Sequence, residues 1–333
     1  MTAPDLTDAR WFAVDLHVPD RRFGILRVDE ALVDRAPFLD TRMPVALADA
    51  IQVPADTVSA ASPPRVAWLF HTSFCASTLL ARALHVAPHT VCLKEPLVLR
   101  RLADARKGGW PIDGLLERTL HLLGRPWHPG GAVVIKPTHV ALNIAVDLMR
   151  ATPDSRGVIM TSSRTDFMIS NLKKLPESQA KIPELVKRAM TASGFAARLS
   201  PAALQPPDLI CAAGLQWAAQ RELMQNAIDT IGASRLRALD AAPYLAQVAQ
   251  ATVACATWLQ LPIPPAALAA HAALEATRNA KALTMPYTPE VRAHEANDVA
   301  TTYRIQLAVA ETWLATHVLP AMRPSALADP SPT

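Results

Sequence analysis

Residues 65–84 read RVAWLFHTSFCASTLLARAL, and this stretch decides how the rest of the chain is interpreted. The apolar run at 65–70 predicts a buried strand, and apolar residues recur at helical spacing from 76 to 84. A turn of small and hydroxyl-bearing residues, 71–78, lies between them. The first backbone N–H groups of a helix lack helical partners and attract phosphate or sulfate oxygens. We therefore expect this strand-to-helix turn to bind an anion.

The turn is not an ordinary P-loop. It contains no glycine, and Ser77 stands where the GxxxxGK[ST] pattern requires lysine, which disfavours Mg-ATP chemistry. Ser77 and Thr78 add hydroxyl donors to the turn, or else they only cap the helix. His71 is either a donor to the anion or a core histidine. Cys75 is interpreted as a packed thiol rather than a nucleophile, because no Cys/His/Asn signature accompanies it.

Further apolar runs, at 90–93, 131–136, 156–161 and 234–239, alternate with helical patterns. This alternation predicts βαβ units and an α/β fold, a P-loop-like parallel sheet flanked by helices. Residues 1–62 form an N-terminal extension in which RWFAVDLHV and FGILRVDEA suggest a hairpin. The main domain is expected over 63–322, with a helix-rich C-terminal half, a helical insert at about 176–230 and only one late strand. Residues 323–333 are predicted to be a disordered tail.

Composition narrows the class of ligand. The chain has 333 residues, half of them hydrophobic, and a formal net charge of +4 without any block of five Lys or Arg. This charge suits a small anionic ligand and does not indicate a nucleic-acid groove. The four cysteines lack metal-ligand spacing, so we expect no metal site and no disulfide framework, and we predict a reducing cytoplasm.

Two segments resemble targeting or membrane signals only superficially. The N-terminus carries acidic residues and no basic start before an apolar core, so it is not a secretory signal. Residues 241–274 contain no Asp, Glu, Lys or Arg, but four prolines and three glutamines interrupt them. We therefore expect buried or amphipathic helices there and no membrane span.

The segment FCASTLL at 74–80 resembles the 5′-phosphosulfate-binding loop of sulfotransferases, which in many bacterial members reads roughly R-S-G-S-T-L-L. It departs from that loop at Phe74, where the family has Arg or Lys, and at Ala76, where it has Gly. The resemblance implies that 3′-phosphoadenosine 5′-phosphosulfate (PAPS) donates the sulfuryl group, that 3′-phosphoadenosine 5′-phosphate (PAP) is the product, and that no metal is required. The implied donor-binding residues in and beside the turn are His71, Ser73, Cys75, Ala76, Ser77 and Thr78.

Two further segments resemble the family's catalytic stretches. LKEPLVLR at 93–100 matches a stretch in which many members carry a Glu-Pro pair, which nominates Glu95 as the base. VVIKPTHVAL at 133–142 resembles the family's lysine-threonine-histidine segment with one residue inserted. There the lysine contacts the transferring group and the histidine is the base, which nominates Lys136 and His139. The choice of base between Glu95 and His139 stays open.

The segment GVIMTSSRTDFMISNLKK at 157–174 resembles the family's 3′-phosphate-binding strand and helix. Ser170 falls on the expected serine, but Ser162 stands at the arginine position and Arg164 is the nearest base. Arg278 and Lys281 are the best late basic pair for the 3′-phosphate, although a charged helix face explains them equally well.

These observations favour a cytoplasmic sulfotransferase-like enzyme that moves a sulfuryl group from PAPS to a hydroxyl or amine. The acceptor is expected to be a small apolar or amphipathic molecule, with the insert at 176–230 as its wall. Two rival functions use the same scaffold. One is a nucleotide-dependent phosphotransferase, and the other is a catalytically idle nucleotide-binding protein, for which Phe74 and Ser162 are the best indications.

Overall fold

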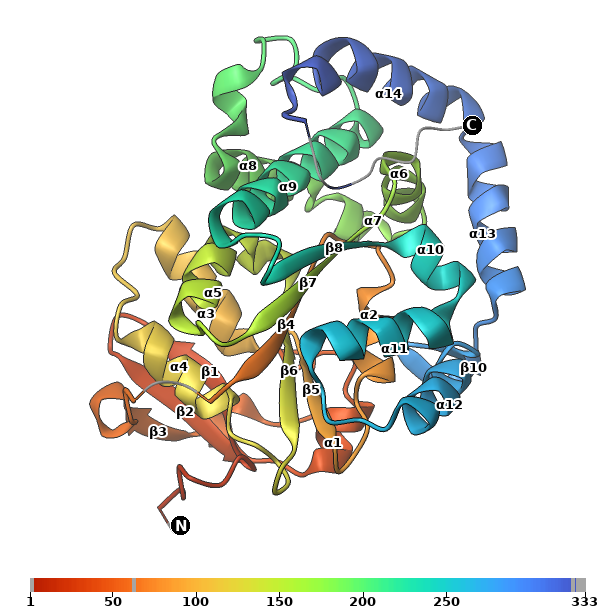
Figure 1. Cartoon of the computed structure of the whole chain (residues 1–333). Helices are drawn as coiled ribbons and strands as arrows, with labels where there is room; N and C mark the ends of the chain where they lie inside the picture. Colours follow the sequence, from red (N-terminus) through yellow and green to blue (C-terminus); the bar gives the residue numbers. More distant parts are fainter. Residues whose placement is uncertain (1–2, 62–63, 325–326, 328–333) are drawn as a thin grey trace.

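The computed structural model of the protein describes residues 3–61, 64–324 and 327. Its central feature is a five-stranded parallel sheet with the strand order β5-β6-β4-β7-β8 (Figure 1). The strands are β4 (Val66–His71), β5 (Thr90–Lys94), β6 (Ala132–Lys136), β7 (Arg156–Thr161) and β8 (Leu236–Asp240). All five correspond to the apolar runs of the sequence. The predicted α/β fold class is therefore confirmed, together with its helix-rich C-terminal half.

Both faces of the sheet are covered, as a parallel sheet requires. Every residue of β4 is buried, and its alternate side chains enter two separate cores. Trp68 and Phe70 face α3 (Leu97–Lys107), α4 (Leu115–Leu123) and α5 (Ala145–Ala151). Ala67 and Leu69 face the other core, which is built from α2 (Ser77–Ala83), α10 (Ala241–Ala246), α11 (Val248–Leu259) and α12 (Pro265–Glu275).

The N-terminal segment forms a second, antiparallel sheet of β1 (Trp11–His17), β2 (Arg22–Arg27) and β3 (Ile51–Pro54). The expected hairpin is the β1–β2 pair. Helix α1 (Glu30–Arg35) follows it, and the 3-10 helices η1 (Leu47–Asp49) and η2 (Ala55–Thr57) flank β3. The buried Lys94 ammonium donates to the carbonyls of Val33 and Asp34 and so fastens α1 to the end of β5. The boundary expected at residues 62–63 lies outside the described residues.

A helical layer occupies the upper part of Figure 1. Its elements are α6 (Arg164–Leu172), α7 (Pro176–Gln179), α8 (Ile182–Ser193), η4 (Phe195–Arg198), α9 (Leu209–Ile231), α13 (Pro289–Thr302), α14 (Arg304–His317) and η5 (Leu319–Ala321). α9 and α14 pack so closely that a Cβ on Gly214 would lie 2.3 Å from Leu314 Cδ1. The main elements of the predicted insert at 176–230 are all helices. It forms a core of its own with α6 and α14.

The C-terminal part contains a hairpin that periodicity does not reveal. β9 (Arg278–Asn279) pairs antiparallel with β10 (Ala282–Pro286), so the expectation of a single late strand is wrong. The alternative that Arg278 and Lys281 lie on a charged helix face is wrong as well. The Asn279 side chain accepts a hydrogen bond from the Lys281 backbone N–H (3.0 Å), and such local bonds compete with a helix.

The apolar stretch at 241–274 folds into α10, α11 and α12. Within residues 3–61, 64–324 and 327, no helix is long and apolar enough to cross a membrane. Most of the tail predicted to be disordered, residues 325–326 and 328–333, lies outside the described residues. Leu327 within it is buried, and its carbonyl accepts a hydrogen bond from Arg221.

Candidate active site

The turn between β4 and α2 has an unusual backbone. Phe74 (φ 63°) and Ala76 (φ 59°) are both left-handed, a conformation that costs a non-glycine residue roughly 1–2 kcal/mol. Ala76 is the N-cap residue of α2 and makes no side-chain capping bond. A left-handed φ favours glycine, which has no Cβ, over the alanine found at this position. The strain is located at the carboxyl end of the central strand, where parallel sheets bind their ligands.

The hydroxyl groups of the turn are not used as helix caps. Ser77 and Thr78 are buried in the first turn of α2, and neither caps the helix. The capping interpretation of these two residues is therefore wrong. Nearby, Thr72 Oγ1 and Ser162 Oγ are buried without a hydrogen-bond partner among the described residues. Buried polar atoms of this kind indicate that the site is shaped for a polar ligand.

Cys75 contributes no reactive thiolate. Its thiol is buried and donates to the Thr72 carbonyl, with Sγ 3.1 Å from the oxygen. Burial raises the pKa of this thiol, so it stays protonated. Ser73, two residues before it, is also buried. The interpretation of Cys75 as a packed thiol agrees with this geometry.

Glu95 and Lys136 form a buried ion pair beside the turn. Lys136 is the last residue of β6, is fully buried, and places Nζ 2.5 Å from Glu95 Oε1. Glu95 follows β5, has a left-handed φ of 59°, and donates its backbone N–H to the Lys136 carbonyl (2.7 Å). Burial acts to raise the pKa of Glu95, but Lys136 and then His71 outweigh it and hold that pKa at about 2. The carboxylate is therefore ionised.

Two neutral histidines flank the ion pair. His71 ends β4, and its Nδ1–H donates to the Thr72 carbonyl (2.7 Å), which leaves Nε2 as an acceptor 3.8 Å from Glu95 Oε1. Burial, followed by the charge of Lys136, lowers the pKa of His71 to about 3. The ring of His139 lies 6.2 Å from that of His71, and burial lowers the pKa of His139 to about 4. Because His71 is uncharged, it does not replace the cation missing at Phe74.

Two further cations come from distant parts of the chain and share one aromatic ring with Lys136. The Arg42 guanidinium stacks 3.6 Å from the Phe38 ring centroid, with Nη2 3.7 Å from Glu95 Oε2. Lys281 Nζ and Lys136 Nζ each lie 5.8 Å from the same centroid. The N-terminal segment and the loop between β9 and β10 thus both bring positive charge to the ends of β5 and β6.

Lys174 supplies a cation at Phe74 itself. Its Nζ lies 4.1 Å from the centroid of the Phe74 ring, which also packs edge-on against Phe167. Burial, together with the neighbouring Lys281 and Lys181, lowers the pKa of Lys174 to about 8. A lysine from the segment after α6 therefore brings positive charge to Phe74 in the turn.

The fold does not gather the residues nominated for the 3′-phosphate into one cluster, unlike the residues around the turn. Arg164 forms an ion pair with Glu311 of α14, and Ser170 lies half-buried on α6. Arg278 lies 3.7 Å from Glu275, which also accepts a 2.8 Å hydrogen bond from Arg82. Both arginines thus already have a carboxylate partner. Their role toward a 3′-phosphate stays a prediction.

The sequence interpretation nominated Glu95, Lys136, His71, His139 and the turn, and the fold brings these residues together. It missed Phe38, Arg42 and Lys174. Lys174 ends the segment 157–174 and carried a usable signal, since a lysine pair directly follows the helix. Arg42 and Phe38 lie in a segment without any motif, and only the tertiary fold places them at the site.

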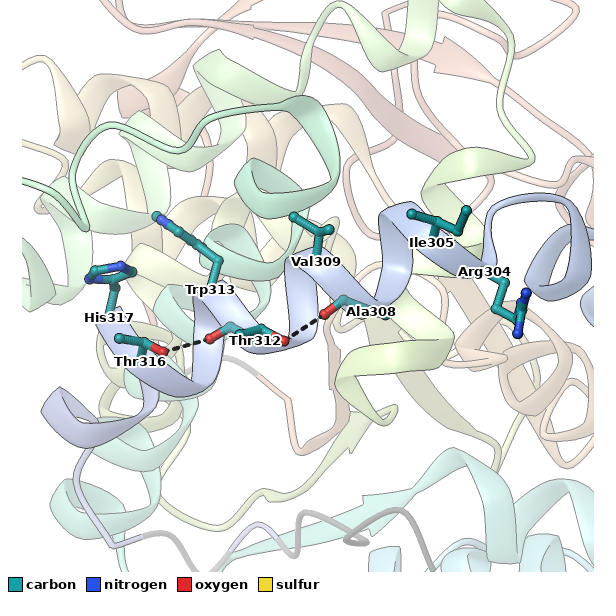
Figure 2. A pocket seen from close by; sticks show the side chains of 8 residues that line it. All are labelled: Arg304, Ile305, Ala308, Val309, Thr312, Trp313, Thr316 and His317. Carbon is teal, nitrogen blue, oxygen red and sulfur yellow. Dashed lines mark hydrogen bonds between the residues drawn. The ribbon is translucent and has the colours of Figure 1, made fainter.

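A separate hollow of about 650 Å³ lies on the outer face of α14 (Figure 2). Residues of α14 alone line it, among them Ile305, Val309 and Trp313. It includes no side chain from the strand ends and none of the residues nominated from the sequence. The hollow is therefore separate from the candidate site at the sheet edge.

Comparison with known proteins gives fold-level similarity only. No family model matches the chain, and no curated protein matches it. Among solved structures, a sulfotransferase from Alicyclobacillus acidocaldarius aligns with 12% identity and a TM-score of 0.39, covering 75% of this chain and 98% of that one. The sulfotransferase domain from the curacin biosynthetic pathway aligns with 12% identity and a TM-score of 0.39, covering 72% and 98%. The chemistry of the site must be inferred from its own residues.

Proposed function

We propose that the protein is a sulfotransferase-like enzyme that transfers a sulfuryl group from PAPS to a hydroxyl or amine of a small acceptor. The observation that carries the proposal is the buried Lys136–Glu95 pair, flanked by His71 and His139 beside the left-handed turn. This arrangement combines a cation, an ionised carboxylate and neutral imidazoles at the end of the central strand. Such a set can move a proton and stabilise a leaving anion.

The residues of the site fit a strongly anionic donor. Arg42, Lys136, Lys174 and Lys281 surround the turn, while Glu95 and Asp40 are the carboxylates paired with them. The buried hydroxyls of Thr72 and Ser162, which have no partner among the described residues, add hydrogen-bonding capacity. An anion with several oxygen atoms would satisfy both the charge and the hydroxyl groups.

When bound, PAPS would supply a sulfuryl group attached to a phosphate leaving group. His139 is the better base of the two candidates, because its buried Nε2 has no hydrogen-bond partner among the described residues. It takes the proton of the acceptor, and the negative charge of Glu95 favours the imidazolium that forms. Glu95 itself is tied to Lys136 and is a weak base. Lys136 offsets the charge that develops on the leaving oxygen.

Calorimetric titration with PAP, ADP and ATP, with and without Mg²⁺, tests the donor. We expect PAP to bind at least tenfold more tightly than ADP without any metal, because its additional phosphate meets a cationic site. Equal affinity for PAP and ADP, or no binding of either, would overturn the proposal. Binding of ATP that strictly requires Mg²⁺ would favour the phosphotransferase instead.

The substitution Thr78→Ala tests the turn. Loss of one charge-assisted hydrogen bond of roughly 1.5–3 kcal/mol should weaken PAP binding about ten- to a hundredfold. Thermal stability should change little, because Thr78 does not cap α2. Thr191→Ala on the exposed surface of α8 is the matched control and should leave PAP affinity unchanged. A Thr78→Ala protein that is destabilised but binds PAP normally would show that Thr78 has only a structural role.

A further inference from the structure

A small polar cavity adjoins the candidate active site. It lies between η3 (His139–Ile144), α8 and α9, and His139 forms part of its wall. Its volume is about 10 Å³, which is room for one water-sized polar group. Leu185, Ala189 and Leu223 supply apolar parts of the lining. The cavity is therefore a narrow recess next to the proposed base.

Four polar atoms of the lining have no hydrogen-bond partner within the described part of the chain: Arg188 Nη2, Asn143 Oδ1, Gln220 Oε1 and His139 Nε2. The Arg188 and Gln220 side chains are strongly buried, with residue exposures of 6% and 3%. Buried polar groups are nearly always satisfied in folded proteins, so four at one recess indicate a binding site.

Two of these side chains, Arg188 and Asn143, are held in place by the protein. Arg188 Nε donates to the Val140 carbonyl (2.9 Å), and its Nη1 is bonded to Asp104. Asn143 Nδ2 donates to the Ala103 carbonyl (2.9 Å), which directs the side-chain oxygen to the recess. The Arg188 donor and the Asn143 carbonyl are thus preorganised, and the Gln220 carbonyl supplies a second acceptor.

This pattern selects a neutral group that both donates and accepts hydrogen bonds. The charge of Arg188 is already balanced by Asp104, and two carbonyl oxygens would repel a carboxylate. An ammonium group would leave the Arg188 donor unpaired and would meet its positive charge. A hydroxyl or a primary carboxamide satisfies the donor and the acceptors together.

We propose, building on the sulfotransferase function above, that this recess binds a second hydroxyl or carboxamide of the acceptor. His139 is both the base and part of the wall, so the two polar groups of the acceptor are only a few atoms apart. Because the recess has room for only one water-sized group, the apolar body of the acceptor lies outside it. The acceptor class is therefore a compact diol or hydroxyamide on an apolar frame.

Binding of matched phenols tests this inference without relying on turnover. The probes are catechol and resorcinol, which carry a second hydroxyl, against phenol, which lacks it, and salicylate, which carries a carboxylate. Calorimetry in the presence of saturating PAP measures each affinity. We expect catechol or resorcinol to bind at least tenfold more tightly than phenol and salicylate.

A matched pair of variants locates the selectivity. Gln220→Leu removes a carbonyl acceptor from the recess and should reduce the diol preference to less than threefold. Gln216→Leu is the control, because Gln216 lies one turn earlier on α9, is equally buried, and also has an unpartnered Oε1, but does not line the recess. It should keep the full preference.

The outcomes separate this inference from the proposed function. Equal binding of phenol and the diols by the wild type, or an unchanged preference in Gln220→Leu, would overturn the inference while PAP binding still supports the sulfotransferase. Tightest binding of salicylate would also overturn it, in favour of an anionic acceptor. PAP binding is measured independently, and its failure would overturn the proposed function. In that case a diol preference measured without PAP would still support the recess as a site for a second hydroxyl.

Discussion

At the scale of single residues, Glu95 shows how the fold assigns chemical roles. Its left-handed backbone places the carboxylate 2.5 Å from the Lys136 ammonium in a buried position. Because Lys136 and His71 overcome the effect of burial, the pKa of Glu95 falls to about 2. A carboxylate that is charged at every physiological pH holds a cation and stabilises an imidazolium better than it accepts a proton.

This reasoning predicts unequal effects of substituting the two candidate bases. His139→Ala should lower kcat about 10²–10⁴-fold while PAP affinity stays nearly unchanged, because a base acts on the acceptor proton in the transition state. Glu95→Gln should be milder in kcat, although its effect on stability must be checked by urea unfolding. Release of PAP with resorcinol as the acceptor measures both. A larger loss in Glu95→Gln at equal stability would make Glu95 the base.

Ala76 permits a prediction about strain. Glycine adopts a φ of 59° without the clash that costs alanine roughly 1–2 kcal/mol, so the substitution stabilises the folded state. Part of this stabilisation is offset because glycine also gives the unfolded chain more conformational freedom. Ala76→Gly should therefore raise the free energy of unfolding by about 0.5–1 kcal/mol. Ala81→Gly, in the interior of α2, is the control and should lower it by about 1 kcal/mol. If both substitutions destabilise the protein equally, the turn is not left-handed in solution.

The residues found from the sequence share one property. His71 and Lys136 directly follow a short apolar run, Glu95 and His139 lie within four residues of the end of one, and the ends of parallel strands meet at one edge of the sheet. Arg42 does not follow such a run, so no local pattern connects it to the site. Its position depends on how the N-terminal segment packs, which is a tertiary property.

At the scale of elements, the loop between α1 and η1 completes the site. Its Leu39 N–H donates to the Lys94 carbonyl (2.6 Å), and its carbonyl accepts from the Leu97 N–H (2.9 Å). These two bonds hold the loop against the carboxyl end of β5. They place Arg42 beside Glu95 and on the face of Phe38. The N-terminal segment is thus part of the proposed donor site.

Arg42→Met tests this contribution. Removing an exposed cation that is bonded to Asp40 on the surface should cost little stability, because surface ion pairs contribute only about 0–1 kcal/mol. PAP affinity should fall about tenfold, and its salt dependence should weaken, since one charged contact is lost. Arg27→Met on the exposed end of β2 is the control for net charge. Equal affinities of the two variants would remove Arg42 from the donor site.

Elements with strong periodicity were predictable, and short ones were not. The strands β4 to β8 are apolar runs, and α9 has a long run of helix-forming residues. β9 has two residues and β10 has five, with mostly exposed or half-buried side chains, so neither produces an apolar run. The turn between β9 and β10 includes a hydrogen bond from the Lys281 backbone N–H to the Asn279 side chain, and such local bonds compete with helix formation.

At the scale of the whole molecule, three cores meet around the candidate site. The two faces of the sheet form two cores, and the helical layer forms the third. The recess of η3, α8 and α9 lies where the helical layer joins the sheet. Half of the residues of the chain are hydrophobic, but composition gives no indication that polar side chains such as Arg188 and Gln220 are buried at this junction. Their burial follows from the packing of the insert on η3.

Buried neutral histidines also make the stability of the whole molecule depend on pH. His71 and His85 are buried, and burial followed by a nearby lysine lowers their pKa values to about 3 and about 4. In the unfolded chain both titrate near 6.5, so as the pH falls below 6.5 the unfolded state binds protons that the folded state does not. Stability is therefore complete above pH 6.5 and is lost as the pH falls toward 4. His139, whose pKa burial lowers to about 4, contributes in the same direction, so the three histidines together should lower the free energy of unfolding by about 5–6 kcal/mol between pH 7 and pH 5.

Urea unfolding at pH 7, 6 and 5, followed by circular dichroism, measures this loss. His71→Asn removes one of the three titrating groups and keeps a side chain that can bond to the Thr72 carbonyl, so it should remove about a third of the pH dependence. His294→Gln changes an exposed histidine of α13 and should leave the dependence unchanged. A free energy of unfolding that is equal at pH 7 and pH 5 would contradict the burial of these imidazoles, including those of His71 and His139 at the site. The argument that neutral, unprotonated ring nitrogens are available at the proposed site would then fail as well.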